Sequence, residues 1–451
     1  MKTVSLHTLG CKLNSAETST IGKQFRERGY TLVDFREPTD VFVLNTCSVT
    51  ERADRECRQL IRRVRRRSPN AYVIVTGCYA QLRPDDIRSI EGVDLVLGAK
   101  EKFNLFDFAR TERKESAPKV HVSSISEVNT FGRALSTDLS EQTRAFLKIQ
   151  DGCDYSCSFC TIPLARGESR SISVEEVWSQ AVHIAEAGFR EIVLTGVNVG
   201  DYGRKSGTDL LSLVRTLVEI EGIKRIRVSS IEPNLLSDDL LEFWLSEPKI
   251  CKHFHIPLQS GSDRILASMK RRYKTSLYAS RIEKIKSKCP DAGIGSDVLV
   301  GFPGESPALF EDTYRFLRDL PLSYLHTFTY SERPNTPAVL LDGIVEPRER
   351  AERSERLRML SVRKRRIYNE SFVGRDVDVL FEQELQRGLW SGLTEHYLRV
   401  NVSLLGEITN QIRRVTIITA ANDHCQGEIS LKEPQCNLEN SPIAHNEVHV
   451  P

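Results

Sequence analysis

Three cysteines lie close together in the segment GCDYSCSFCTIP of this 451-residue chain. Cys153, Cys157 and Cys160 follow the spacing C-x3-C-x2-C. Thiolates are soft ligands, so three of them on one loop favour a single metal centre. A tetrahedral zinc site needs a fourth ligand, and no histidine or cysteine nearby in the sequence supplies one. A [4Fe–4S] cluster held by three cysteines, with one iron left open for a substrate, is therefore a better interpretation than zinc or structural cysteines.

Three more cysteines are scattered along the N-terminal part of the chain. Cys11, Cys47 and Cys78 each come at or just after the end of a β-branched apolar run. Because the C-terminal ends of parallel strands meet at one edge of a sheet, these thiols should converge in space. Buried structural cysteine is the alternative, since cysteine is common in protein cores. Taken with the first triplet, the pattern predicts a second cluster, again with three protein ligands and one open iron.

The residues around the second triplet predict an α/β unit. Strand candidates are 2–9, 41–46 and 72–77, and helical patterns lie around 14–28 and 50–67. This βαβαβ alternation is typical of a doubly wound parallel sheet.

A longer alternation of the same kind begins near residue 145. It predicts an incomplete β/α barrel, in which the first cysteine triplet directly follows the first strand, where such barrels place their active sites. The six strand candidates are 145–149, 191–195, 225–229, 253–256, 295–301 and 324–330. The intervening helix candidates are 173–187, 208–220, 237–246, 275–288 and 305–319.

A charged helix at 347–370 is followed by alternating strands at 375–382, 397–404 and 413–419, which predict a small antiparallel β-barrel. The expected fold is thus α/β with a C-terminal β-barrel. The expected domains are an N-terminal sheet (1–118), a linker (119–143), a six-stranded partial barrel (144–370), the small β-barrel (371–422) and a disordered tail (423–451).

The segment CDYSCSFC, in its context at 145–370, resembles the radical S-adenosylmethionine (SAM) enzymes. The resemblance implies that the open iron binds the amino and carboxylate groups of SAM, and that reductive cleavage yields a 5′-deoxyadenosyl radical. Polar residues and glycines after the barrel strands are then candidate SAM contacts, although ordinary turn chemistry also explains them. These candidates are Thr195, Gly196, Asn198, Ser229, Glu232, Gln259 and Asp297.

The segments GCKLNSAE, NTCSVTERADRECRQLIRR and VTGCYAQ resemble the methylthiotransferase family, and this resemblance covers about 1–420. Its members are two-cluster radical SAM enzymes with a C-terminal RNA-binding TRAM barrel, and the six cysteines fall on the family's six ligand positions. GCKLN is similar to the branch that acts on N6-threonylcarbamoyladenosine at tRNA position 37. The branches that act on isopentenyladenosine and on a ribosomal protein tend toward GCQMN and GCPKN.

This resemblance implies a reaction and partners. One SAM would supply the methyl group and a second would be cleaved, and a methylthio group would reach carbon 2 of the adenine in tRNAs that read ANN codons. The implied cofactors are two [4Fe–4S] clusters and SAM. The implied partners are the tRNA anticodon stem-loop and an electron donor such as flavodoxin or ferredoxin, and the protein is expected to be a monomer.

Arginine clusters point to the RNA. Residues 52–67 hold eight arginines and two acidic residues, and 347–370 hold nine basic and four acidic residues. Clustered arginine can follow a phosphate backbone, although a solvated helix face with i,i+4 ion pairs is the alternative. No acidic residue lies within 62–67, which favours RNA contact there. The candidate RNA-binding residues are Arg62, Arg63, Arg65, Arg66, Arg67, Arg413 and Arg414, with Trp390 and Tyr397 as candidates for base stacking or core packing.

Composition sets wider limits. The net charge is only +2, and eleven cysteines in a chain without an export signal favour metal binding or catalysis over disulfides. No apolar run is long enough for a transmembrane helix, so a cytoplasmic protein is expected. The sequence leaves three functions open. They are methylthiolation of threonylcarbamoyladenosine, methylthiolation of isopentenyladenosine or of a ribosomal-protein aspartate, and non-catalytic iron–sulfur RNA binding or redox sensing.

Overall fold

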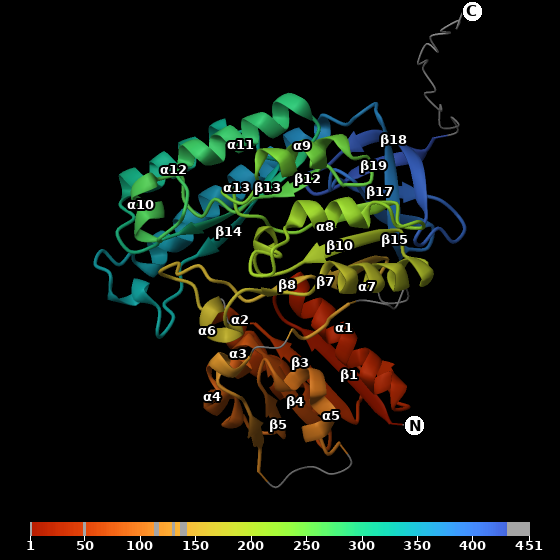
Figure 1. Ribbon diagram of the computed structural model, residues 1–451, viewed down its shortest axis with the longest axis vertical. Coiled ribbons are helices and arrows are strands. Elements are labelled where there is room, and N and C mark those ends of the chain that lie inside the picture. The colour runs from red at the N-terminus through yellow and green to blue at the C-terminus, as the bar shows by residue number, and fades with distance from the viewer. Residues whose placement is uncertain (1, 48–50, 112–116, 129–130, 136–141, 431–451) are drawn as a thin grey trace, which may run out of the picture.

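A parallel sheet, a larger α/β unit and a small β-barrel follow one another along the chain (Figure 1). The computed structural model describes residues 2–47, 51–111, 117–128, 131–135 and 142–430. In the described residues, no helix is both long and apolar enough to cross a membrane.

The N-terminal sheet has six strands in the order β2-β1-β3-β4-β5-β6, and every neighbouring pair is parallel. The central strands β3 and β4 are buried along their whole length, as their continuous apolar runs predict. The strands are β1 (Thr3–Thr8), β2 (Thr31–Val33), β3 (Val41–Thr46), β4 (Tyr72–Gly77), β5 (Leu95–Leu97) and β6 (Lys119–His121). The helices are α1 (Lys12–Glu27), α2 (Glu51–Arg67), α3 (Cys78–Leu82), α4 (Pro84–Arg88) and α5 (Leu105–Phe108).

The sheet extends further than the sequence predicted. Strand β6 lies within the segment expected to be a linker, and it pairs with β5 through the register Leu95↔Lys119. The boundary at residue 118 was therefore wrong, because the first residues of the expected linker complete the sheet.

The central unit contains the six predicted parallel strands, in chain order. They are β7 (Arg144–Lys148), β10 (Glu191–Thr195), β11 (Arg225–Val228), β12 (His253–His255), β13 (Gly293–Val300) and β14 (Tyr324–Thr329). They form two three-stranded sheets, joined by a bridge between Ile226 and Ile250. A short hairpin of β8 (Gln150–Asp151) and β9 (Arg170–Ser171) frames the cysteine loop.

Helices cover the outer face of these strands. Three of them begin at a serine whose side chain accepts a hydrogen bond from the first turn: Ser173 from the N–H of Glu176, Ser237 from that of Leu240, and Ser306 from that of Leu309. The helices are α6 (Ile162–Arg166), α7 (Val174–Glu186), α8 (Leu210–Leu217), α9 (Asp238–Ser246), α10 (Asp263–Ser268), α11 (Thr275–Lys288), α12 (Pro307–Asp319) and α13 (Pro347–Glu370).

Alternation along the strands separates an apolar face from a polar one. Ile192 and Leu194 of β10 belong to the main core under the helices. Glu191, at an alternate position, contacts Arg227 of β11 instead. The face of β10 turned away from the helices, called here the inner face, thus carries a buried ion pair beside the apolar side chain of Val193.

The C-terminal unit is a closed five-stranded barrel in the order β15-β16-β17-β19-β18. The barrel prediction is confirmed, but the barrel is not wholly antiparallel, because β17 and β19 pair in parallel. A closed barrel with an odd number of strands cannot alternate direction everywhere, so one parallel pair is required. The strands are β15 (Asp376–Gln386), β16 (Leu389–Thr394), β17 (Arg399–Ser403), β18 (Ile412–Ala420) and β19 (Cys425–Ile429).

Strand β19 lies within the segment 423–451 that was expected to be a disordered tail. The barrel therefore continues to Ile429, and its boundary at residue 422 was wrong. The sequence CQGEI has little apolar character, and its inward positions are Cys425 and Gly427. Residues 431–451 lie outside the described part of the chain.

The small barrel docks against the N-terminal ends of the central strands. The Arg225 guanidinium donates hydrogen bonds to the carbonyl oxygens of Leu393 (2.9 Å) and Asp378 (2.8 Å). The Tyr397 ring stacks on His253 with centroids 4.3 Å apart. The barrel thus covers the end of the central unit that lies opposite to the cysteine loop.

Gly77 makes the turn from β4 into Cys78 possible. Its φ is +98°, and a Cβ there would collide with the main chain of Thr46. We expect Gly77→Ala to lower the free energy of unfolding by about 3–5 kcal/mol, from backbone strain plus overpacking. Gly207 has φ +76°, and nothing lies within 4 Å of the point that an added methyl group would occupy, so Gly207→Ala should cost only the strain, about 1–2 kcal/mol. Urea unfolding followed by circular dichroism compares the two, and equal losses would contradict this account.

Candidate active site

The loop with the first cysteine triplet lies between β8 and α6, and main-chain hydrogen bonds hold its shape. The N–H of Cys153 donates to the carbonyl oxygen of Gly167 (3.0 Å), and the N–H of Cys160 donates to that of Cys157 (3.1 Å). The side chain of Cys157 is buried and the other two are half-buried. The loop therefore presents three thiols from one fixed segment.

The buried thiols of this triplet need a nearby positive charge to lose their protons. Burial, with smaller contributions from the neighbouring thiols, raises the pKa of Cys153 to about 11 and that of Cys160 to about 12. The Arg271 guanidinium donates to the sulfur of Cys157 at 3.2 Å. Metal ions bind the deprotonated thiolate, so a bound metal centre would supply the positive charge that these sulfurs need.

The second triplet comes from three adjacent strands of the N-terminal sheet. Cys11, Cys47 and Cys78 follow β1, β3 and β4, which are neighbours in the sheet. Gly10, with φ +105°, passes so close over Cys47 that a Cβ there would be 3.0 Å from its sulfur. Burial raises the pKa of the Cys11 thiol, Arg166 lowers it, and Cys78 raises it again, so these groups are near one another. The three cysteines thus follow neighbouring parallel strands at one edge of the sheet.

The thiols of neither triplet lie as close together as the ligands of a preformed zinc site. Among the described residues, the only three metal-ligating side chains whose ligand atoms lie within 4.8 Å of one another are His255, Asp297 and His326. A zinc ion with bonds of about 2.3 Å would draw its sulfurs to about 3.8 Å apart. Neither cysteine triplet is that tight, whereas a multi-iron cluster spans a wider gap.

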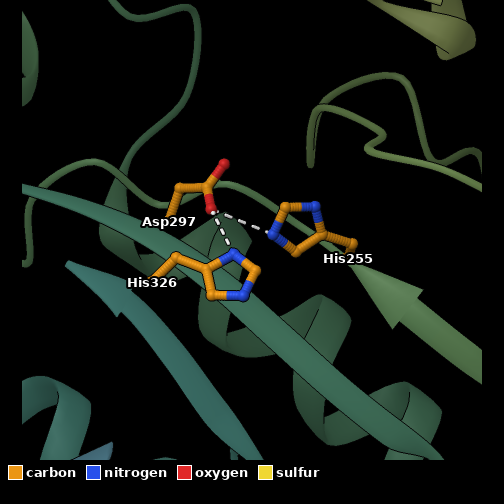
Figure 2. A group of neighbouring side chains, drawn as sticks. All are labelled: His255, Asp297 and His326. Carbon is orange, nitrogen blue, oxygen red and sulfur yellow. Dashed lines mark hydrogen bonds and ion pairs between the residues drawn. The ribbon is translucent and has the colours of Figure 1, made fainter. Parts of the chain in front are cut away.

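The histidine–aspartate group lies at β12, β13 and β14, on the inner face of the central unit (Figure 2). Asp297 Oδ1 accepts hydrogen bonds from His255 Nε2 (3.0 Å) and His326 Nδ1 (3.2 Å). Burial alone would raise the pKa of Asp297, but these hydrogen bonds hold it well below its usual value. The three side chains could hold a cation, yet the shared carboxylate oxygen already accounts for their arrangement.

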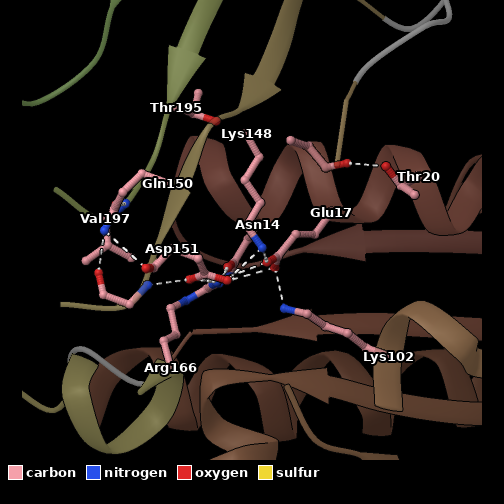
Figure 3. Close-up of polar contacts among 12 residues, drawn as sticks. Asn14, Glu17, Thr20, Lys102, Lys148, Gln150, Asp151, Arg166, Thr195 and Val197 are labelled. Carbon is pink, nitrogen blue, oxygen red and sulfur yellow. Dashed lines mark hydrogen bonds and ion pairs between the residues drawn. The ribbon is translucent and has the colours of Figure 1, made fainter. Parts of the chain in front are cut away.

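Buried charged side chains join the N-terminal sheet to the central unit (Figure 3). Glu17 of α1 lies at the middle of this network and is fully buried. It contacts Lys102 Nζ (2.6 Å), Lys148 Nζ (3.2 Å) and Arg166 Nη1 (3.0 Å). Asp151 accepts from Lys148 (2.6 Å) and Arg166 (3.0 Å). Because removal of one partner leaves an uncompensated buried charge, this network strongly disfavours separation of the two units.

Comparison with protein families agrees with this division. The family described as "Uncharacterized protein family UPF0004" matches residues 3–98, and the radical SAM superfamily matches residues 147–317. The threonylcarbamoyladenosine tRNA methylthiotransferase MtaB of Bacillus subtilis is 38% identical over 436 residues, covering 95% of this chain and 96% of the relative. That of Aquifex aeolicus is 39% identical over 413 residues, covering 91% and 99%.

This chain belongs to the radical SAM methylthiotransferase family. A tRNA-2-methylthio-N(6)-dimethylallyladenosine synthase of Syntrophus aciditrophicus is also similar, with 32% identity over 441 residues, covering 96% of this chain and 95% of the relative. Among solved structures, the radical SAM methyltransferase TsrM of Kitasatospora setae has a TM-score of 0.55 at 15% identity, covering 75% of this chain and 77% of that one. The latter likeness concerns the fold alone.

Membership in the radical SAM superfamily implies a [4Fe–4S] cluster and SAM, and two of the expected SAM contacts fit a ligand. In the described part of the chain, the Asn198 side chain and the Ser229 hydroxyl are buried without a hydrogen-bond partner. Buried polar groups are normally satisfied, so these atoms suit a bound molecule. Gln259 has φ +71°, and its N–H donates to the carbonyl oxygen of Asp297 (2.9 Å).

Other expected SAM contacts of this methylthiotransferase are already engaged. Glu232 forms an ion pair with Arg271, the residue that also donates to Cys157. The Thr195 hydroxyl donates to the carbonyl oxygen of Leu147 (3.3 Å), and Gly196 packs against Gln150. Arg271, His255 and His326 were not among the residues predicted from the sequence. Strand alternation places both histidines on the inner face of the central unit, so the sequence pattern could have predicted them. No local pattern points to Arg271.

The expected RNA-binding arginines differ in their surroundings. Within the described part of the chain, no ion pair or hydrogen bond engages Arg62, Arg63 or Arg66, and all three are exposed. Arg65 instead pairs with Glu91, so an acidic partner comes from another segment. Arg67 donates to the carbonyl oxygen of Phe35 (2.7 Å).

The helix α13 and the small barrel offer less to RNA. Arg353 of α13 is buried against Glu305 and Glu349. On β18, Arg413 donates to Gln411 and Arg414 pairs with Asp378. The side chain of Trp390 belongs to the barrel core, and Tyr397 packs between units, so core packing is the better explanation for both aromatic residues.

Proposed function

We propose that this protein is a tRNA methylthiotransferase that attaches a methylthio group to carbon 2 of N6-threonylcarbamoyladenosine at position 37. The observation that carries the proposal is the presence of two separate cysteine triplets on two units locked together by the Glu17 network. Relatives named for this activity align along nearly the whole chain and support the choice of substrate. Dimethylallyladenosine methylthiolation is the second candidate. Its support is weaker, because the relative named for it is only 32% identical to this chain.

In this proposal Cys153, Cys157 and Cys160 hold one [4Fe–4S] cluster, and Cys11, Cys47 and Cys78 hold a second. When bound, the clusters and SAM supply one-electron reduction and the sulfur to be methylated, chemistry that belongs to the cofactors. The chain's own residues position these groups. Arg271 places positive charge at Cys157, and Asn198 and Ser229 offer unsatisfied polar atoms to SAM.

The inner face of the central unit would receive the adenine base. Its open end lies toward the cysteine loop, because the small barrel covers the opposite end. His255, Asp297 and His326 then form a polar wall beside the base, and their shared hydrogen bonds fix the orientation of both imidazoles.

We extend the proposal to domains and partners. The N-terminal unit runs through β6, the central unit through α13 and the TRAM-like barrel through β19. The tRNA anticodon stem-loop and an electron donor such as flavodoxin or ferredoxin are the partners of a monomeric, cytoplasmic enzyme. Exposed arginines of α2 would contact RNA phosphates.

Nucleoside analysis tests the reaction. In tRNA from cells that lack the gene, 2-methylthio-N6-threonylcarbamoyladenosine should disappear and its unmethylthiolated precursor should accumulate, because no other step would act on carbon 2. Mass spectrometry of digested tRNA measures both, and the dimethylallyladenosine derivatives in the same digest serve as the control. Unchanged levels of 2-methylthio-N6-threonylcarbamoyladenosine would refute the assignment.

Iron analysis tests the two clusters. The variant with Cys153→Ala, Cys157→Ala and Cys160→Ala should retain about half of the iron of the reconstituted wild type, because the N-terminal triplet still binds one cluster. It should also produce no 5′-deoxyadenosine under reduction. A matched variant, Cys57→Ala with Cys251→Ala, removes two buried cysteines outside both triplets and should keep all of the iron. Full iron retention by the triple variant would contradict the presence of two clusters.

Filter binding at several salt concentrations tests the RNA surface. The variant Arg62→Gln, Arg63→Gln, Arg66→Gln should bind tRNA more weakly, and its salt dependence should fall by about 0.9 per lost phosphate contact. The control removes the same charge from α13, at Arg348, Arg358 and Arg366, each of which pairs with an acidic residue of its own helix. Equal weakening in both variants would indicate a general charge effect.

A further inference from the structure

The buried network between the N-terminal and central units does not balance its own charge. Its fully buried charged side chains are the cations Lys102, Lys148 and Arg166 and the anions Glu17 and Asp151. Arg170 also contacts Asp151, but it is 15% exposed and reaches solvent, so the count is made on the fully buried groups. One positive charge is therefore in excess. A buried charge without a counter-ion is costly, so an anion is expected next to this network.

Arg166 is the cation of this network that lies next to the second cysteine triplet. This residue ends α6, which packs against α3, the helix that begins at Cys78. Arg166 Nη2 donates to Asn14 Oδ1 at 2.6 Å, and the Cys11 sulfur lies 4.0 Å from the same oxygen. Arg166 also interacts electrostatically with both Cys11 and Cys78. All three cations contact Glu17, and Lys148 and Arg166 also contact Asp151, but of the three only Arg166 also donates to Asn14 beside Cys11.

We propose that Arg166 of the central unit is the counter-ion of the iron–sulfur cluster held by the N-terminal sheet, which couples binding of that cluster to docking of the two units. The proposal rests on the two-cluster function proposed above. Three thiolates around a [4Fe–4S]²⁺ core carry one net negative charge, which matches the one positive charge in excess.

The position of Arg166 in the chain adds a second consequence. It comes six residues after Cys160, the last cysteine of the first triplet. One short segment thus carries ligands for one cluster and the counter-ion for the other. Since α6 is fixed by Arg166 on Asn14 and Glu17, this segment sets the placement of the two clusters relative to one another. Arg166 is a positioning residue in this account.

The experiment uses the full-length chain with Cys153→Ala, Cys157→Ala and Cys160→Ala, so that iron reports on the N-terminal triplet alone. In this background Arg166→Met is compared with Lys102→Met. Both substitutions remove one buried positive charge and one partner of Glu17, but only Arg166 faces the cysteines. The rate of iron loss to a chelator and the reduction midpoint of the cluster are measured for each.

We expect Arg166→Met to lose iron about tenfold or more faster than Lys102→Met, as for other residues that support metal ligands. Its cluster should also be harder to reduce, because a nearby positive charge that stabilises the added electron is gone. Arg166→Lys keeps the charge and should recover most of both properties. If Arg166→Met does not fold, Arg166→Gln, which removes the charge but keeps a hydrogen-bond donor, is compared with Lys102→Gln by the same two measurements.

Three outcomes overturn three different statements. Equal iron loss and equal midpoints for Arg166→Met and Lys102→Met would reduce Arg166 to a structural partner of Glu17 and would refute the counter-ion. Absence of iron from the parent triple variant itself would refute the second cluster and, with it, the proposed function. Amide hydrogen exchange in α6 provides the readout for docking: reconstitution should slow it in the parent, and no change would refute the coupling.

Discussion

The buried carboxylate of Glu17 is the interaction on which the arrangement of the whole molecule depends. It lies on α1 of the N-terminal sheet, yet two of its three cationic partners, Lys148 and Arg166, belong to the central unit. Charges inside a protein are tolerated only when they are paired and hydrogen-bonded. The two units therefore cannot part without leaving several ions in a poor environment, and the edge of the sheet that carries Cys11, Cys47 and Cys78 is held against the segment after Cys160.

A second set of polar contacts closes the other end of the central unit. Arg225 and Arg227 project from β11 and donate to carbonyl oxygens of the small barrel. Arg144 of β7 pairs with Glu382 of β15 at 2.6 Å. These contacts use guanidinium groups that donate to main-chain oxygens and to one carboxylate, and such directional hydrogen bonds fix the orientation of the barrel. The central unit is thus covered at one end by the small barrel, and the N-terminal unit packs against it elsewhere.

Strong local patterns made much of the fold predictable. The fully buried runs Val41–Thr46 and Tyr72–Gly77 could only be central parallel strands, and the cysteines after them had to meet at one sheet edge. Strand β19 was missed because its inward positions are a cysteine and a glycine, which carry no clear alternation. The pairing of β17 with β19 follows from closure of the barrel and not from either sequence.

The site was predictable only where its residues share a segment or a sheet edge. Arg166 donates to Glu17, a residue 149 positions away, and Arg271 reaches Cys157 across 114 positions. No spacing rule connects such residues, because their proximity is produced by packing of whole units. Likewise, the burial of Arg353 on α13 shows that a run of arginines can serve internal ion pairs as well as a surface.

The position of the small barrel has a consequence for solvent. Tyr397 has φ +68°, and its ring packs on His253. The cations of Lys12 and Arg227 lie over the same ring, so aromatic and charged groups fill the contact between the barrel and the central unit. Loss of this barrel would open a route for water to the inner face of the central unit, where excluded solvent protects reactive species from side reactions. The barrel thus also serves to keep solvent away from that face.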